Sequence, residues 1–333
     1  MTILGVGQML GCSKKIRTGL LVGVSVAALT VAMPEMAKPA DLPAKAPVFQ
    51  AAAAAPQITW WIEGGAMLTG GGEVNYFDPA FGVTRGIKPG TGWTIAGGFD
   101  YRFATSPWHV SVDFRYGRAR TSSQSFSSTF AIGPFFSSSA SNASHDEHHW
   151  VADFMVGRDI GLGTGSQLKL GLRVADLSAT TNIAASGYRT VIGFPIFSFS
   201  SAVAQRSRFV GVGPRAAIDG AVQIQGPWSI DYNAGLALLY GNRELDVSGT
   251  TSCFGVGCLG PSSFNNSFDS KGWVPNADAS LALAYAITPS FKISAGYQID
   301  YYWGGLRTLD ANQNPTNIDR SYSGPFVRLT GKF

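Results

Sequence analysis

The sequence predicts an all-β protein, an antiparallel up-and-down transmembrane β-barrel of about ten strands. Apolar and polar residues alternate with period two in one segment after another, which is the pattern of strands with two unlike faces. Charged residues make up only 14% of the chain, against roughly 25% in soluble domains, while glycine (41 residues) and aromatic residues (12%) are abundant. After residue 40, the 333-residue chain has no run of 18 apolar residues, the length that a membrane helix needs.

The first 40 residues are typical of an export signal. Lys14, Lys15 and Arg17 precede an apolar run over 18–33, and small residues follow near Ala40. Residues 41–56 form a Pro/Ala-rich periplasmic linker, and residues 57–333 form the barrel. Removing residues 1–40 lowers the formal charge from +4 to about +1, so the composition gives no indication of nucleic-acid binding.

About ten alternating segments follow Gln57, each near the 9–11 residues with which a tilted strand crosses a membrane. The sixth segment contains Pro214, which cannot donate a ladder hydrogen bond and therefore predicts a bulge or local irregularity. The segments are 58–68, 93–103, 108–116, 150–156, 168–174, 210–219, 228–240, 278–287, 291–301 and 321–333.

The connections between these segments alternate between short and long. Short periplasmic turns and long extracellular loops are typical of outer-membrane barrels, and an even strand number puts both ends of the barrel on the periplasmic side. Twelve strands result if the phenylalanine-rich stretches 121–144 and 187–203 form hairpins. Otherwise these stretches fold into the barrel mouth, pack on its rim or contact a partner. The expected long loops are 69–90, 119–148, 179–206, 243–271 and 304–320.

Sixteen charged residues within the strands all have the parity opposite to the apolar side chains. A lysine or arginine facing lipid at the bilayer midplane would cost about 2–4 kcal/mol, so this shared parity predicts that the charges line the lumen. The eight acids and eight bases are in balance. They are Glu63, Asp100, Arg102, Asp113, Arg115, Asp153, Lys169, Arg173, Arg215, Asp219, Asp231, Asp278, Lys292, Asp300, Arg328 and Lys332.

The last strand, SYSGPFVRLTGKF, ends on an aromatic residue, Phe333, which is typical of the closing strand of a bacterial outer-membrane barrel. We expect Phe333 to be recognised by the barrel assembly machinery. The expected surroundings are outer-membrane lipid and lipopolysaccharide in a Gram-negative bacterium, and the pattern is compatible with a homo-oligomer.

Several stretches resemble the pore-forming outer-membrane proteins of the Legionella major outer-membrane protein family. They are HHWVADFMVGRDIGLG (148–163), FVGVGPRAAIDG (209–220), GLALLYG (235–241), GWVPNADASLALAY (272–285) and the closing strand. The linker ADLPAKAP (40–47) is similar to the mature start of outer-membrane proteins from α-proteobacteria. The resemblance implies an outer-membrane β-barrel that forms pores, and it implies no catalytic residues.

The cluster around His145, His148 and His149 is the one group that could carry chemistry. Imidazole and carboxylate groups suit zinc or copper, and a ten-stranded barrel with such groups at its rim is similar to omptin proteases. However, adjacent residues of a strand face opposite sides, so His148 and His149 could not share a ligand. We expect side chains at the barrel's outer surface or rim, with no metal, no cofactor and no enzymatic activity.

Two cysteines, Cys253 and Cys258, lie in one expected outer loop. In an oxidising compartment their spacing predicts a loop-closing disulfide. Cys12 lies within the export signal.

The polar, charge-balanced lumen favours passive diffusion of small hydrophilic solutes or ions. The alternative is a closed structural or surface-interaction barrel that acts, like an adhesin, through its extracellular loops. Ten strands lie near the eight at which side chains fill a barrel, and far from the sixteen to eighteen that leave a water channel.

Overall fold

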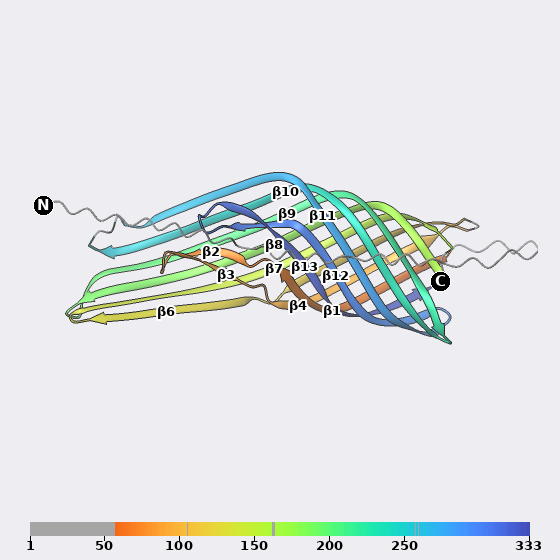
Figure 1. The fold of residues 1–333 in the computed structure, drawn as a ribbon, viewed down its shortest axis with the longest axis horizontal. Helices are drawn as coiled ribbons and strands as arrows, with labels where there is room; N and C mark the ends of the chain where they lie inside the picture. Colours follow the sequence, from red (N-terminus) through yellow and green to blue (C-terminus); the bar gives the residue numbers. More distant parts are fainter. Residues whose placement is uncertain (1–56, 105, 162–163, 257, 259) are drawn as a thin grey trace, which may run out of the picture. The chain divides into compact units, whose positions relative to one another are not determined.

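The computed structural model describes residues 57–104, 106–161, 164–256, 258 and 260–333, and it confirms the predicted antiparallel barrel (Figure 1). The expected export signal, with Cys12, and the linker over 41–56 lie outside these residues. In the part of the chain so described, no helix is long and apolar enough to cross a membrane.

Ten strands close the ring, and one further strand extends it at the outer end. β13 pairs with β1, and β5 pairs with β7, so the ten strands close into a ring. β6 pairs only with the first part of β7, beyond the end of β5. The strands are β1 (Gln57–Gly71), β2 (Val74–Asp78), β3 (Val83–Ile87), β4 (Thr91–Arg102), β5 (Trp108–Ala119), β6 (Ser122–Ile132), β7 (Phe135–Asp159), β8 (Thr164–Val191), β9 (Phe194–Gln225), β10 (Trp228–Gly255), β11 (Ser262–Thr288), β12 (Phe291–Leu309) and β13 (Pro315–Lys332).

Most of the expected long loops are in fact strands, so that part of the prediction is wrong. β7 to β11 have 25–32 residues each, far more than a membrane crossing requires. The stretches 121–144 and 187–203 do form hairpins, but these lengthen the ring strands β7, β8 and β9 and add only β6, which lies outside the ring, so the ring does not have twelve strands. These stretches lack the strict alternation of apolar and polar residues that marks the lipid-facing strands.

In the part of the barrel that contains all ten ring strands, the outward face is a band of exposed apolar side chains, as the alternation predicts. Leu170, Leu236 and Leu281 are examples from three strands. Aromatic pairs such as Trp93–Tyr116 and Tyr240–Trp273 border this band at its outer edge, and Trp60 stacks on Phe333 at the other edge. An apolar band between aromatic girdles is the surface that a transmembrane barrel presents to lipid.

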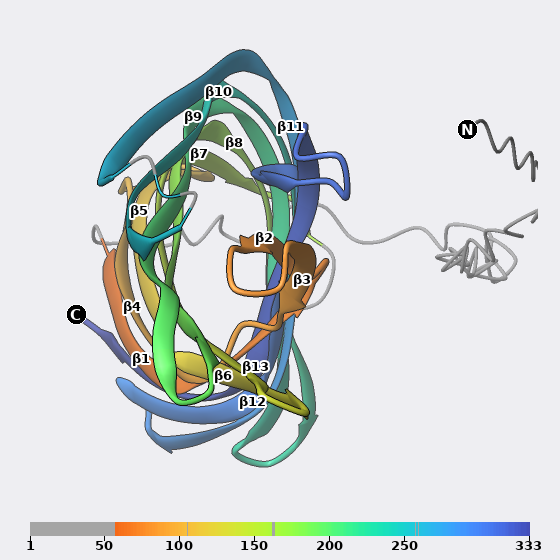
Figure 2. The same cartoon turned by 90° about the vertical axis from the view of Figure 1, so that its left-hand side faces the viewer.

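The first expected long loop, 69–90, contains the small hairpin of β2 and β3. This hairpin is separate from the main sheet and lies within the ring of strands in the view of Figure 2. It therefore occupies the outer end of the lumen.

At Pro214 the structure shows the local irregularity that the sequence predicts rather than a bulge, because the register of β9 is unchanged. Leu172 of β8 still pairs with Pro214, whereas the rungs between Pro214 and β10 are missing. The ladder is interrupted because proline has no N–H to donate, and the rungs on either side hold the register.

Cys253 and Cys258 form a disulfide at the end of β10, with their Cα atoms 5.7 Å apart.

Candidate functional site in the lumen

The periplasmic half of the lumen contains a cavity of about 320 Å³. Fourteen of the sixteen predicted lumen charges line it. Glu63 is buried beside this cavity, where it accepts hydrogen bonds from Arg328, at 3.0 Å from Nε and 2.6 Å from Nη2. Asp300 does not line the cavity; it is buried near Arg173. The shared parity of the charges thus brings residues from every strand of the ring to one place.

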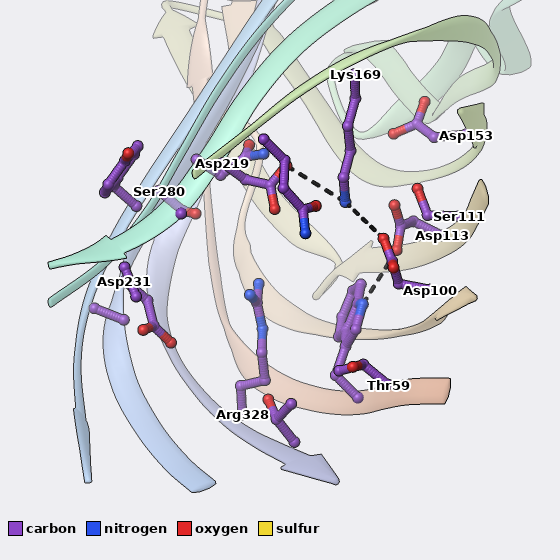
Figure 3. A pocket seen from close by; sticks show the side chains of 18 of the residues that line it. Thr59, Asp100, Ser111, Asp113, Asp153, Lys169, Asp219, Asp231, Ser280 and Arg328 are labelled. Carbon is purple, nitrogen blue, oxygen red and sulfur yellow. Dashed lines mark hydrogen bonds and ion pairs between the residues drawn. The ribbon is translucent and has the colours of Figure 1, made fainter. Parts of the chain in front are cut away.

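Lys169 links the acids on the cavity wall. Its Nζ lies 3.3 Å from a carboxylate oxygen of Asp100 and 3.4 Å from one of Asp219, as Figure 3 shows. The carboxylate of Asp100 also lies 2.7 Å from Nδ1 of His109. Nearer the mouth, Lys292 pairs with Asp231 at 2.6 Å and Arg102 pairs with Asp159 at 2.8 Å. Most of these charged side chains therefore form ion pairs with one another.

Arg173 is the centre of a second, fully buried network. Its guanidinium donates two hydrogen bonds of 2.7 Å to Asp153 and one of 3.0 Å to Asp278. Arg215 also pairs with Asp278, and Asn276 joins Asp278's neighbour Asp300 to the network through a 2.5 Å hydrogen bond. Since these residues belong to β7, β8, β9, β11 and β12, the network crosses the lumen and ties its walls together.

An apolar layer lies beyond this network in the outward direction along each strand. Nine of the ten ring strands contribute buried side chains to it. Leu177, Phe209, Leu239, Tyr302 and Leu306 are each 0% exposed although they lie inside the ring. Side chains of the barrel wall thus fill the lumen at this level. The layer consists of Met67, Ala119, Val151, Ala175, Leu177, Ala179, Phe209, Ala237, Leu239, Val274, Tyr302, Leu306 and Tyr322.

A buried polar cluster lies on the outer side of the apolar layer. Arg320 donates a hydrogen bond of 2.9 Å to Glu147, and the hydroxyl of Tyr322 donates another of 2.9 Å. Arg320 also donates to the carbonyl oxygen of Gly72 at 2.5 Å, two residues before β2 begins. The cluster therefore fixes the point at which the chain enters the inner hairpin.

The inner hairpin is held by four strands of the wall. Asn75 exchanges hydrogen bonds with Thr308 and accepts one from Gln205 at 3.0 Å, while Asp78 accepts one from Ser141 at 2.7 Å. The apolar residues Val74, Tyr76 and Ile87 pack on Ala143 and Ile183. These contacts seat the hairpin as a plug rather than as a loose loop.

The histidines do not form the surface cluster that the sequence predicts. His145 and His149 are buried inside the ring, because β7 continues far beyond the expected rim, whereas His148 has the opposite, outward parity. His145 contacts Thr181 and Glu147, and His149 stacks on Tyr322 with ring centroids 3.8 Å apart. Among the residues whose positions the structure gives, no three histidine, cysteine or acidic side chains are arranged to hold a metal ion.

The apolar layer and the inner hairpin were not predicted from the sequence. The layer did leave a signal: Leu239 and Tyr302 are apolar residues at the parity of the lumen charges, within the runs Leu238–Leu239–Tyr240 and Tyr301–Tyr302–Trp303. The inner hairpin has a weaker signal in the sequence, since residues 69–90 have the glycine-rich composition of an ordinary loop.

Comparison with known proteins identifies one family. Residues 48–333 match the family model described as Legionella pneumophila major outer membrane protein precursor. No curated protein matches the chain.

Solved structures similar to this chain include outer-membrane proteins of several kinds. The outer membrane protease OmpT from Escherichia coli is 11% identical, with 83% of this chain and 97% of that chain covered and a TM-score of 0.38. Neisserial surface protein A is 11% identical, with 81% and 95% covered and a TM-score of 0.24. The CymD monoaromatic hydrocarbon channel is 8% identical, with 84% and 88% covered and a TM-score of 0.28.

Proposed function

The chain belongs to the family of the Legionella pneumophila major outer membrane protein, and from this premise we propose that it is a closed barrel that acts through the sheet it presents outside the membrane. It lies in the outer membrane of a Gram-negative bacterium. The proposal assigns no reaction to the histidines, because His145 and His149 are buried among side chains of the wall.

The observation that carries the proposal is the apolar layer. Its members belong to the strands themselves, so a solute could pass only if side chains on nearly every strand moved together. Packed side chains of this kind are as dense as an organic crystal and leave no path for water. The expectation that ten strands lie near the filled limit agrees with this arrangement.

Passive diffusion of small hydrophilic solutes or ions is the second candidate function. The observation that favours it is the charged periplasmic cavity of about 320 Å³, which offers polar groups of both signs to an entering solute. Conduction would require a second conformation in which both the apolar layer and the inner hairpin give way.

Swelling of proteoliposomes in isotonic solutions of a small sugar distinguishes the two functions. We expect no swelling from the refolded protein. Proteoliposomes with a variant in which a Gly-Ser linker replaces residues 73–88 should also not swell, because the apolar layer still fills the lumen when the hairpin is missing. A variant with L177A, L239A and L306A opens the layer and should swell.

The matched control carries L170A, L236A and L281A, the same change on the lipid-facing side, and should not swell. Swelling of the unmodified protein above the rate of empty vesicles would overturn the closed-barrel proposal and support the pore.

A further inference from the structure

The molecule has a second exposed apolar zone besides its lipid-facing band. It lies at the extracellular ends of the longest strands, where Phe135, Ile192, Phe194, Phe254 and Val256 project from the sheet; we call these residues the apolar tip. Phe194 and Phe254 are both 73% exposed, whereas Leu236, the most exposed leucine of the lipid-facing band, is 67% exposed. Exposed patches of large apolar residues mark interaction sites on natural proteins.

The five residues come from three chain segments that are neighbours in space. The N–H of Ile192 donates to the carbonyl of Pro134 at 2.9 Å, and the N–H of Val256 donates to the carbonyl of Ile196 at 3.1 Å. Phe135 pairs across the ladder with Val191, which also pairs with Phe194. The ends of β6 and β8 lie together at the left edge of Figure 1. The apolar tip is therefore one patch.

The apolar tip is too far from the lipid-facing band to enter the membrane that holds the barrel. On β7, Phe154 belongs to the band and Phe135 to the tip, about 19 residues apart, or roughly 60 Å along a strand. The outward side chains between them include His148, Asp146 and Asn142, which do not enter hydrocarbon. The tip needs an apolar medium of its own.

The charges around the apolar tip fit a lipid surface. Stretches 121–144, 190–205 and 247–268 contain no charged residue at all, and the nearest charge on the β8–β9 hairpin is the cation of Arg189. Without carboxylates the tip meets no repulsion from lipid phosphates, and a single arginine near a bilayer surface adds attraction. Phenylalanine and isoleucine side chains beside such a group are typical of segments that insert shallowly into the interface.

The geometry of the apolar tip also favours a bilayer over a second protein. Phe135 has the parity of lumen-facing Ser141, and Phe254 has the parity of lipid-facing Tyr240, so apolar side chains leave both faces of the sheet. Ile192 lies in the turn itself, with a φ of 52°. An edge that is apolar on both sides and at its end is suited to entering a fluid layer, whereas a protein partner would cover one face.

We propose that the apolar tip docks the protein onto a second lipid bilayer, by shallow insertion of these side chains among its lipids. This inference rests on the proposed function, since it names the partner through which a closed surface barrel would act.

Vesicle capture tests the proposal. The full-length protein is held in nanodiscs and mixed with vesicles of phosphatidylcholine, or of phosphatidylcholine with phosphatidylserine, and flotation measures the captured fraction. We expect capture by both vesicles, stronger with the anionic lipid. The triple variant F135S, F194S and F254S should lose capture by at least about tenfold, because it exposes three fewer apolar side chains to the lipid.

The control is V83S, which changes an exposed apolar residue of the inner hairpin and should capture vesicles normally. The heat-dependent shift of the folded barrel on gels shows that each variant folds. Capture that is the same for the triple variant and the unmodified protein would overturn the proposal. The proposal would also be overturned if the unmodified protein captured no vesicles. This holds even if the nanodiscs associate with one another through the apolar tips of two copies of the protein. The swelling experiment tests a different claim from the capture experiment. Swelling of vesicles that contain the unmodified protein would overturn the closed barrel, and vesicle capture would still test whether the apolar tip binds a bilayer.

Discussion

One continuous sheet contains two regions with different sources of stability, and β8 passes through both. In its first part Leu168, Leu170 and Leu172 face outward while Lys169 and Arg173 join the buried networks of the lumen. In its second part the outward residues are small and polar, such as Asn182 and Ser186. The spanning region faces lipid on one side and the charged networks of the lumen on the other. The outward face of the outer region meets water, and that region is held by its backbone ladder and by the inner hairpin.

This contrast implies that the same substitution has a large effect in the spanning region and a small one in the outer region. The side chains of the Arg173 network in the spanning region are at most 9% exposed, so the loss of one member leaves partners that water solvates poorly. On the outward face of the outer region, water takes the place of a lost partner.

The largest expected effect is that of R173M. Removing this guanidinium takes an ion-pair partner from Asp153, Asp278 and Asp300 and leaves Arg215 paired with the first two. Breaking a buried pair costs about 3–5 kcal/mol. The free energy of unfolding, measured by urea titration of tryptophan fluorescence in vesicles, should fall by about this amount.

The matched variant is R208M, which breaks the outward pair of Arg208 with Asp176 at 2.6 Å. The Arg208 side chain is 43% exposed, so the loss should be at most about 1 kcal/mol. Equal losses in the two variants would contradict the contrast between the regions.

The next largest effect compares two positions with the same outward parity on β8. L170R puts a cation against hydrocarbon and should cost about 2–4 kcal/mol if it lies near the bilayer midplane. N182R puts the same cation in water and should change the unfolding free energy by less than about 0.5 kcal/mol. The same urea titration measures both, and a costly N182R would mean that the lipid-facing band extends further than the aromatic girdle indicates.

The smallest effect is expected for the disulfide. Cys253 and Cys258 close a short segment at the end of β10, and short loops gain the least from a cross-link, no more than about 2 kcal/mol here. Reduction, or a C253S and C258S variant, should speed proteolysis near residues 256–261 and leave the unfolding of the barrel almost unchanged. A large loss of barrel stability would show that the outer region supports the spanning region.

The spanning region could be predicted from sequence because two solvents act on it. Leu170 and Lys169 belong to opposite faces, and hydrocarbon on one side makes that alternation strict. The outer region could not be predicted in this way. Its outward side meets water, which does not require apolar residues at outward positions such as Asn182 and Ser186. No strict alternation therefore marks these strands, and the sequence predicts loops there. The inner hairpin depends on contacts of Asn75 and Asp78 with residues far away in the chain, which no local pattern records.

The lumen site could also be predicted only in part. Parity placed Arg173 and Asp278 on the lumen side, and the structure shows them in one network. Parity could not tell that Leu239 and Tyr302 belong to one buried cluster, because their strands, β10 and β12, are not paired with each other.

Single-channel conductance of the refolded protein in a planar bilayer, at several salt concentrations, tests the closed lumen most directly. A closed barrel gives no discrete steps from protein shown to be folded, and steps only after L177A, L239A and L306A open the apolar layer. Discrete steps from the unmodified protein that scale with bulk salt would contradict it, and would mean a water-filled pore.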